Sequence, residues 1–395
     1  MSAPAKLPPF DPADPLGIDD LLSADDLAIR DTVRSWAADR VLPHIAQWYE
    51  DGQVPVRELA RELGGLGALG MSLTGYGCAG ATAVQYGLAC LELEAADSGI
   101  RSLVSVQGSL AMYAIWKYGS EEQKQRWLPS MAAGETIGCF GLTEPDHGSD
   151  PAGMRTYAKK DGADWVLNGR KMWITNGSVA GVAVVWAQTD DGIRGFAVPT
   201  DTPGFSAPEI KHKWSLRASV TSELVMDEVR LPADAVLPGV TGLKGPLSCL
   251  SHARYGIVWG AMGAARASFE AAVEYAKTRE QFGRPIGGFQ LTQAKLADMA
   301  VELHKGVLLA HHLGLRMDAG RLRPEQVSFG KLNNVREAIE ICRTSRTILG
   351  ANGISLEYPV MRHATNLESV LTYEGTVEMH QLVLGKALTG LDAFR

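Results

Sequence analysis

The sequence has little of what marks secreted, metal-binding, membrane-spanning or nucleic-acid-binding chains. It contains five cysteines in 395 residues and no C-x-x-C pair, which argues against a disulfide framework and against a zinc site. No apolar run approaches the roughly 18 residues of a membrane-spanning helix. Lys and Arg number 38 against 45 Asp and Glu, without a basic stripe. We therefore expect a cytoplasmic protein without a metal site that binds neither nucleic acid nor membrane, since the start also lacks the features of a targeting peptide.

The hydrophobic pattern divides the chain into three regions. Apolar residues lie three and four apart over 23–42 and 56–69, and Ser120 opens a capping box, so residues 1–136 are predicted to be helical. Residues 137–240 are predicted to form a compact antiparallel sheet or barrel. Their turn dipeptides are Asp161-Gly162, Asn168-Gly169, Asn176-Gly177 and Asp191-Gly192.

The helical period returns over residues 241–395. It predicts helices at Tyr255–Arg279, Gln290–Asp318 and Pro324–Leu349, and a last helix that starts near Thr376. The predicted fold class is therefore α+β, with a helical domain, a β domain and a helical bundle in that order.

Two motifs do not carry the chemistry that they superficially match. Residues 65–70 have the G-x-G-x-x-G spacing of a dinucleotide-binding turn, but they follow a helix instead of a strand, which favours a helix end. His304 and His311 share one helix face two turns apart, without the i,i+4 spacing of a helical zinc pair.

Two segments of the β region could bind a cofactor. The Phe140–Asp150 loop combines Gly, Thr and Ser residues and could approach a polar ring or a pyrophosphate, or it could be an ordinary capped loop. Trp173, followed by Ile174 and Thr175, could shield a planar cofactor or belong to the core. Similarly, Arg279 at a helix end suits a diphosphate but could simply be solvated.

Glu374 is the sharpest local candidate for acid–base chemistry. It follows an apolar pair and precedes Gly375 and a predicted N-cap, Thr376. A desolvated carboxylate has a raised pKa, which suits a general base. The alternative is a carboxylate that merely favours the start of a helix.

Taken together, the segments resemble the acyl-CoA dehydrogenase family, and within it the glutaryl-CoA dehydrogenases, over almost the whole chain. The resembling stretches are Asp97–Ser102, Ser105–Gln107, Phe140–Asp150, Trp173–Thr175, Ala253–Gly256 and Tyr373–Thr376. The resemblance implies a C-terminal four-helix bundle, a homotetramer and FAD bound between the middle and C-terminal domains. Its implied cofactor-binding residues are Phe140, Leu142, Thr143, Gly148, Ser149, Trp173, Ile174, Thr175, Arg279, Phe282, Gln290, Thr347, Leu349, Gly350, Ala351, Thr376 and Phe394. Arg279, Gln290 and Thr347–Ala351 would reach the FAD of a partner subunit.

The resemblance also implies a substrate and a reaction. Glu374 would be the catalytic base, and Arg101 would hold the terminal carboxylate of glutaryl-CoA. The remaining implied substrate-binding residues are Ser102, Ser105, Ser149, Leu247, Arg254, Tyr373, Gly375 and Glu94. The expected reaction is dehydrogenation with decarboxylation to crotonyl-CoA, with electrons passed to an electron-transferring flavoprotein in a route of lysine and tryptophan degradation. A non-decarboxylating dehydrogenase of glutaryl-CoA or another short acyl-CoA, and a catalytically silent acyl-CoA-binding flavoprotein, are the alternatives.

Overall fold

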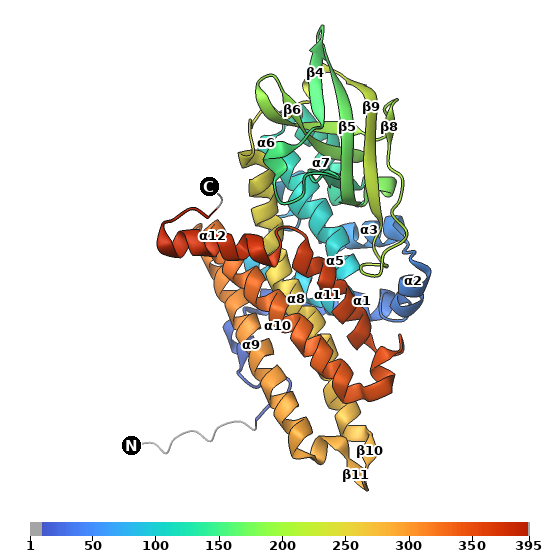
Figure 1. The fold of residues 1–395 in the computed structure, drawn as a ribbon, viewed down its shortest axis with the longest axis vertical. Coiled ribbons are helices and arrows are strands. Elements are labelled where there is room, and N and C mark those ends of the chain that lie inside the picture. Colours follow the sequence, from blue (N-terminus) through green and yellow to red (C-terminus); the bar gives the residue numbers. More distant parts are fainter. Residues whose placement is uncertain (1–9, 394–395) are drawn as a thin grey trace.

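The computed structural model describes residues 10–393. In Figure 1 the β sheet lies at one end of the long axis, and long helices extend from it to the opposite end. Among the described residues, no helix is both long and apolar enough to cross a membrane.

The first region is helical, as predicted. Its elements are α1 (Ala24–Arg40), α2 (Ile45–Asp51), α3 (Val56–Gly65), the hairpin β1 (Thr74–Gly75) and β2 (Cys78–Ala79), α4 (Ala83–Ala96), α5 (Ser98–Ser105), a π-helical segment (Val106–Met112), α6 (Tyr113–Tyr118) and α7 (Glu121–Ala132). The capping box at Ser120 is confirmed, since its hydroxyl accepts from the Gln123 N–H while the Gln123 side chain accepts from the Ser120 N–H. The G-x-G-x-x-G motif lies where α3 ends, with Gly67 and Gly70 at positive φ, and so it is a helix-end turn.

The second region is a curled mixed sheet, and the expectation of a purely antiparallel sheet is wrong. Its strands are β3 (Gly138–Gly141), β4 (Tyr157–Asp161), β5 (Asp164–Thr175), β6 (Val182–Thr189), β7 (Gly192–Pro199), β8 (Phe205–Ser206) and β9 (Thr221–Leu231). Their order is β3-β6-β4-β5-β9-β8, with β7 also pairing with β6. The pairs β3–β6 and β4–β6 are parallel, because the chain crosses over between these strands instead of turning directly back.

Two of the four predicted turns are hairpin turns and two are not. Asp161-Gly162 lies at the β4–β5 turn and Asp191-Gly192 at the β6–β7 turn. Asn168-Gly169 instead lies inside β5, where the register with β9 shifts. Asn176-Gly177 ends β5 and leads into a 3-10 turn. The Asn-Gly signal marks positive φ, which a bulge or a strand end requires as often as a hairpin does.

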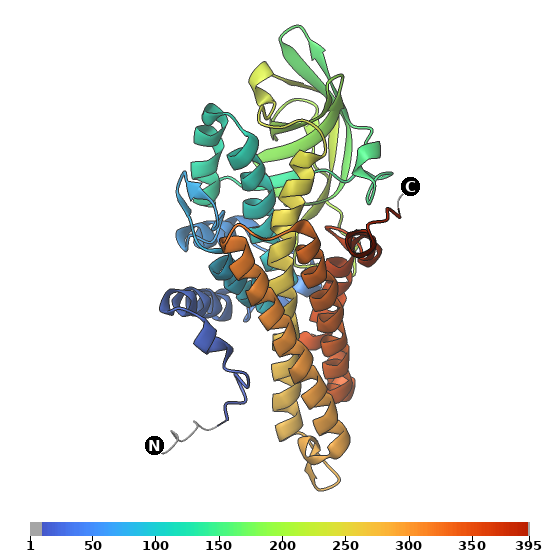
Figure 2. The ribbon, with the colours of Figure 1, turned by 90° about the vertical axis from the view of Figure 1, so that its left-hand side faces the viewer.

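The third region is built on long helices. Its elements are α8 (Lys244–Thr278), the hairpin β10 (Glu280–Gln281) and β11 (Arg284–Pro285), α9 (Gln290–Asp318), α10 (Pro324–Leu349), α11 (Pro359–Thr372) and α12 (Val377–Thr389). The predicted bounds of α9 and α10 are confirmed to the residue, whereas α8 begins before the predicted Tyr255. Figure 2 shows α8 in yellow, running from the sheet to the far tip of the molecule.

The core joins the first and third regions. Helix α4 is buried along almost its whole length, between α1 and α8. At the start of α5, Asp97 accepts from the Gly99 N–H (2.7 Å), from Arg362 Nη1 (2.5 Å) and from Asn366 Nδ2 (2.9 Å). This buried cap anchors α5 to α11, and α5 carries Arg101.

Candidate active site

Glu374 lies in a strained turn between α11 and α12. Its φ is 52° and that of Gly375 is 99°, so two consecutive residues have positive φ. Such a conformation costs a non-glycine residue of order 1–3 kcal/mol and persists only where the surroundings impose it. Thr376 then caps α12, its hydroxyl accepting from the Met379 N–H. The predicted start of the last helix is thereby confirmed.

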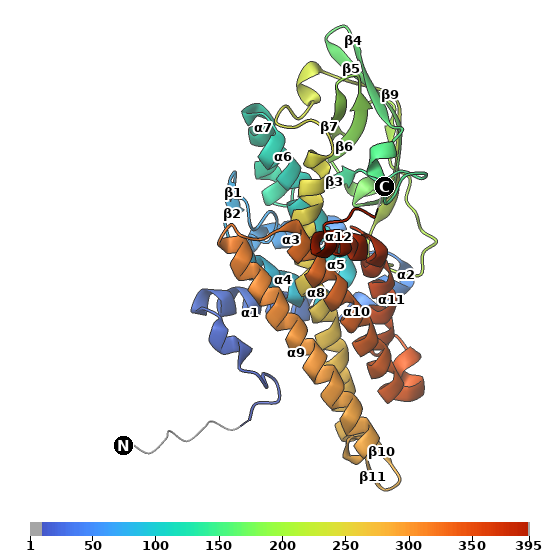
Figure 3. The same cartoon turned by 60° about the vertical axis from the view of Figure 1, so that its left-hand side comes forward.

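Two cations, the buried Lys331 and the half-buried Arg254, hold this turn through its backbone. Lys331 Nζ, on α10, donates to the carbonyl oxygens of Tyr373 and Gly375, each at 2.6 Å. Arg254 Nε, on α8, donates to the carbonyl oxygen of Glu374, also at 2.6 Å. Three successive carbonyls are therefore bound by cationic side chains from two other helices. Figure 3 shows α12 lying across α10 at the end of the bundle nearer the sheet.

The Glu374 carboxylate is in the state expected of a general base. Its Oε2 atom is buried and has no hydrogen-bond partner within residues 10–393. Burial raises the pKa of Glu374 above its ordinary value of 4.5, while the charges of Arg101, Arg254 and Lys331 act in the opposite direction. The predicted direction of this pKa shift is confirmed.

Arg101 is paired with Glu94 at the base of the site. Both side chains are almost fully buried, and Arg101 Nε lies 2.6 Å from Glu94 Oε2. Glu94 Oε1 also accepts from the Ser98 hydroxyl at 2.8 Å. Arg101 Nη2 donates to the Tyr373 hydroxyl, next to the base. The guanidinium thus links α4 and α5 to the Glu374 turn.

The other residues expected to bind substrate lie at different depths. Ser102 and Ser105 are buried on α5 with Arg101, and the Ser105 hydroxyl is buried without a partner within residues 10–393. Leu247 is 41% exposed on the first turns of α8. Ser149 is exposed in the loop after β3.

That loop is fixed by a buried ion pair that the sequence did not suggest. Glu144 accepts from the N–H groups of Arg155 (2.6 Å) and Thr156 (2.9 Å) and from Lys171 Nζ (2.8 Å). Lys171 Nζ also donates to the Leu142 carbonyl oxygen at 3.1 Å. Burial lowers the pKa of Lys171 to about 8. The segment therefore has a rigid base, while Gly148 and Ser149 at its outer end are exposed.

Trp173 is not a core residue. Its φ is 63° at the irregularity in β5, and its side chain is 59% exposed. Just before it, the Met172 N–H donates to the Thr143 carbonyl oxygen at 2.8 Å, which ties β5 to the Phe140–Asp150 loop. Phe140, Leu142 and Ile174 are buried, whereas Thr143 and Thr175 are half-buried beside the exposed indole.

The structure does not bring all the expected cofactor-binding residues together. Arg279, Phe282 and Gln290 lie around the β10–β11 hairpin, at the opposite end of the long axis from the sheet (Figure 1). The Thr347–Ala351 segment ends α10 on the same side, where Asn352 Nδ2 donates to the hydroxyl of Tyr275 near the end of α8 (3.1 Å). Thr347, Gly350 and Ala351 are exposed and Leu349 is buried. Phe394 lies outside the described residues.

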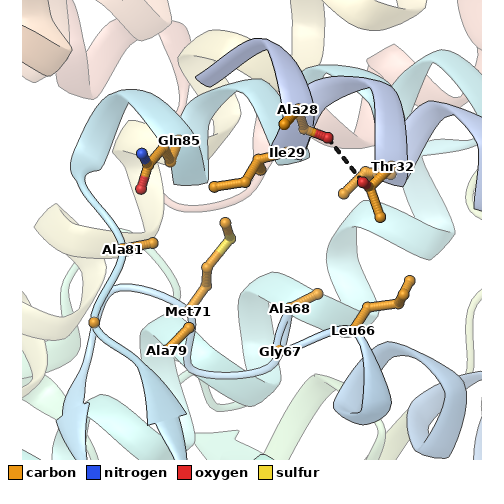
Figure 4. A pocket seen from close by; sticks show the side chains of 12 residues that line it. Ala28, Ile29, Thr32, Leu66, Gly67, Ala68, Met71, Ala79, Ala81 and Gln85 are labelled. Carbon is orange, nitrogen blue, oxygen red and sulfur yellow. Dashed lines mark hydrogen bonds between the residues drawn. The ribbon is translucent and has the colours of Figure 1, made fainter. Parts of the chain in front are cut away.

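A separate cavity of about 410 Å³ lies between α1, the end of α3 and the β1–β2 hairpin. Ile29, Met71 and Gln85 are among its lining side chains (Figure 4). None of the residues expected to bind cofactor or substrate lines this cavity.

Comparison with known proteins agrees with this architecture. Three family models match: the acyl-CoA dehydrogenase N-terminal domain over residues 23–135, the middle domain over 139–229 and the C-terminal domain over 241–389. Human mitochondrial short-chain specific acyl-CoA dehydrogenase is 36% identical over 361 residues, covering 89% of this chain and 87% of the relative.

Solved structures match as well, two of them at higher identity. The glutaryl-CoA dehydrogenase of Mycobacterium smegmatis is 72% identical, with a TM-score of 0.96 and coverage of 97% of this chain and 99% of that chain. Another glutaryl-CoA dehydrogenase from the same organism, in complex with FADH2, is 65% identical with a TM-score of 0.95, covering 96% and 98%. A glutaryl-coenzyme A dehydrogenase in complex with glutaryl-CoA is 32% identical with a TM-score of 0.89, covering 93% and 96%.

The chain belongs to the acyl-CoA dehydrogenase family. Its α+β fold is the family fold, with a helical N-terminal domain, a middle sheet domain and a helical C-terminal domain.

Proposed function

We propose that the protein oxidises glutaryl-CoA and decarboxylates the product to crotonyl-CoA, with Glu374 as the base. The observation that carries the proposal is the buried guanidinium of Arg101 beside the strained turn that bears Glu374. The similarity to three glutaryl-CoA dehydrogenase structures supports the same substrate.

The enzyme is an FAD-dependent oxidoreductase, and the residues around the Phe140–Asp150 loop fit that cofactor. The exposed indole of Trp173 offers a flat apolar face, and a Cβ added at Gly148 would meet no atom within 4 Å. We propose that Phe140, Leu142, Thr143, Gly148, Ser149 and Thr376 hold the cofactor, with Trp173, Ile174 and Thr175 beside its ring. When bound, FAD supplies the acceptor for the hydride that leaves the β-carbon of the thioester.

Glu374 removes the proton from the α-carbon in this proposal. Its buried, unpartnered Oε2 is free to receive a proton, and burial raises the pKa of Glu374, which favours this transfer. The acid formed in this step remains in the site and can return the proton to another carbon of the same substrate.

Arg101 provides the selectivity for a dicarboxylyl thioester. A terminal carboxylate that reaches α5 would meet the guanidinium, together with the Ser102 and Ser105 hydroxyls. Ser105 is suited to this because its buried hydroxyl has no other partner within residues 10–393. An apolar acyl chain would leave the Ser105 hydroxyl without a partner, and an unsatisfied buried group of this kind costs of order 1–3 kcal/mol.

Decarboxylation follows from the product of the first step. Once the α and β carbons share a double bond, breaking the bond between the γ-carbon and the carboxylate releases CO₂ and leaves an electron pair delocalised into the thioester. Protonated Glu374 then gives its proton to the γ-carbon, which yields crotonyl-CoA and restores the base. Arg101 must release the carboxylate at this stage, and its pairing with Glu94 moderates its hold on the substrate.

We also propose a homotetramer and electron transfer to an electron-transferring flavoprotein. The separation of the two sets of expected cofactor residues along the molecule supports assembly, because one bound FAD cannot contact both ends of the same chain (Figure 1). Arg279, Phe282, Gln290 and residues 347–351 would then meet the cofactor of a partner subunit.

The proposal is tested by adding glutaryl-CoA anaerobically to the purified yellow protein, following flavin absorbance and identifying the thioester by mass spectrometry. Bleaching with crotonyl-CoA and CO₂ is the expected result. Bleaching with glutaconyl-CoA would show a non-decarboxylating enzyme. Bleaching only with a different acyl-CoA would remove the assigned role of Arg101.

A matched variant tests the base and the catalytically silent alternative. Glu374→Gln keeps the size of the side chain, and we expect it to retain flavin while losing at least about 10²-fold in bleaching rate, in line with general-base contributions. Normal turnover by this variant would contradict the mechanism.

A further inference from the structure

Lys331 is a buried cation that neither the expected catalytic set nor the expected binding set includes. Only 2% of its surface is exposed, on the face of α10 that packs against the Glu374 turn. Its Nζ donates to the carbonyl oxygens of Tyr373 and Gly375, the residues on either side of Glu374, at 2.6 Å each. Burying an ammonium group is costly unless it is well paired, so the position needs a reason beyond helix packing.

The turn supplies that reason, because its conformation is unfavourable in isolation. Glu374 and Gly375 both have positive φ, a backbone conformation that residues at the start of a helix do not ordinarily adopt. Lys331 binds two of these carbonyls and Arg254 binds the one between them. Removing Lys331 would leave one cationic contact on a strained segment.

The same helix face also holds the beginning of α12. Ser328, one turn before Lys331, lies 3.0 Å from His380 Nδ1. A Cβ added at Gly375 would lie 3.0 Å from His380 Nε2, so the turn and α12 are closely packed against each other. One face of α10 therefore contacts both the Glu374 turn, through Lys331, and the start of α12, through Ser328.

We propose that Lys331 is a positioning residue for Glu374. It fixes the turn through the Tyr373 and Gly375 carbonyls, and its charge favours the ionised, reactive form of the base. This inference rests on the proposed role of Glu374, and it does not depend on which acyl-CoA is the substrate.

Several charged and titratable groups surround the Glu374 carboxylate. Arg101 on α5, Arg254 on α8 and Lys331 on α10 lower its pKa by their charge, against the effect of burial. Tyr373 lies beside it in the turn, and Glu94 on α4 neutralises part of Arg101. His380 on α12 is neutral at working pH, because burial lowers its pKa to about 3. Burial also lowers the pKa of Lys331 itself to about 7, against the charge of Glu374, so Lys331 acts as a cation in this balance below that pH. Among the three basic side chains, it alone bonds to both flanking carbonyls.

The test compares Lys331→Met with the wild-type holoenzyme, using the acyl-CoA that the wild type reduces. We expect kcat to fall about 10²-fold, because misplacing a base by about 1 Å has this effect, while KM changes less than about threefold. The apparent pKa of the base in the kcat/KM profile should rise by about one unit, since an opposite charge nearby is lost.

Lys331→Gln separates the two parts of the role. An amide can still donate to one carbonyl but carries no charge, so we expect kcat to recover partly while the apparent pKa stays raised. A second readout without turnover is the melting temperature against pH, where the raised pKa of Glu374 should appear as a shifted inflection.

Asn334→Leu is the matched control. Asn334 is fully buried on the same helix, one turn further along, and donates to the carbonyl oxygens of Val258 and Gly306 without contacting the turn. We expect this variant to melt at a lower temperature with an unchanged pH profile. If Lys331→Met behaves in the same way, with normal kcat and normal pH dependence, its role is only structural and the inference is wrong. If the wild type does not reduce glutaryl-CoA but reduces another thioester, only the proposed substrate fails.

Discussion

Arg101 Nε and Glu94 Oε2 lie 2.6 Å apart, in side chains that are 1% and 0% exposed. The charge proposed to bind the substrate carboxylate is therefore already neutralised before substrate arrives. A carboxylate that enters the site shares the guanidinium with Glu94 instead of meeting a free cation, and this limits how tightly it is held.

Removing Arg101 should lower two separate quantities, the stability of the fold and the preference for glutaryl-CoA over butyryl-CoA. Arg101→Met leaves the Glu94 carboxylate buried without its cation, and we expect a loss of about 3–5 kcal/mol in the free energy of unfolding. The variant should also lose most of its activity on glutaryl-CoA and much less of its activity on butyryl-CoA. Denaturant unfolding and steady-state kinetics with both thioesters measure the two effects.

The double variant Arg101→Met with Glu94→Gln is the control for that loss. Because both charges are removed, most of the stability should return while the preference for glutaryl-CoA does not. A double variant that regained glutaryl-CoA activity would show that Arg101 is not the carboxylate anchor.

The raised pKa of Glu374 has opposite effects on activity and stability. The base acts when ionised, so kcat/KM should rise with pH through this pKa, which lies above 4.5. The folded state prefers the protonated form, so the stability from Glu374 is fully present below the unfolded pKa and is lost as pH rises through the folded pKa.

Glu374→Gln should therefore be more stable than the wild type at neutral pH and equally stable below about pH 4. Each tenfold change in proton affinity corresponds to about 1.4 kcal/mol. Melting temperatures of the two proteins across pH measure this difference. A wild type that is the more stable protein at neutral pH would contradict the direction of the shift.

The Lys171–Glu144 pair should govern retention of the cofactor. Lys171→Met leaves Glu144 without its cation beneath the Phe140–Asp150 loop, and we expect a loss of about 3–5 kcal/mol in stability together with weaker FAD binding. The ratio of flavin absorbance to protein absorbance after gel filtration measures the loss.

The ion pair between Arg343 and Glu368 provides a matched control. Both side chains are 54% exposed and their contact is 2.9 Å, so Arg343→Met should change stability by about 1 kcal/mol or less and leave FAD bound. Equal FAD loss in both variants would remove the special role of the buried pair.

Phe282 tests the assembly. It is 94% exposed at the tip of the β10–β11 hairpin, and under the proposed assembly its side chain meets the cofactor of a partner subunit. Phe282→Ser should weaken the proposed tetramer and FAD binding by about tenfold or more without unfolding the subunit. Analytical ultracentrifugation and flavin content measure the two effects. Trp214→Ser, at an 87% exposed residue in another region, should change neither.

The sequence specifies the long helices well where their ends carry local signals. Pro324 fixes the first turn of α10, and Gln290 follows a turn rich in glycine, so both starts were predicted to the residue. Helix α8 begins earlier than predicted because its first turns, from Lys244, contain polar residues and a proline, which hide the apolar period. The middle sheet itself was predicted, but its parallel pairs were not, because turn signals do not show which strands pair after a crossover connection. Two of the four turn signals also marked a bulge or a strand end instead of a hairpin.

The candidate site was predicted less completely than the fold. Local sequence singled out Glu374 and the resemblance singled out Arg101, and both stay predictions, whereas neither drew attention to the buried Lys331 and Lys171. A lysine within an amphipathic helix or strand is usually solvated, and only the three-dimensional packing shows that these two are buried. The one available signal is that Lys331 lies on the helix face of Val327, Asn334 and Val335, all of which are buried.

The distance between the hairpin tip and the flavin loop has a genetic consequence under the proposed assembly. One cofactor site then combines the loop and base of one polypeptide with the tip of another. Two defective proteins, one carrying Glu374→Gln and the other Phe282→Ser, would complement each other when co-assembled, because half of the mixed sites would contain an intact base and an intact tip. Mutations of the base and mutations of the hairpin tip would therefore behave in genetic tests as defects in two separate functions, although both lie in one gene.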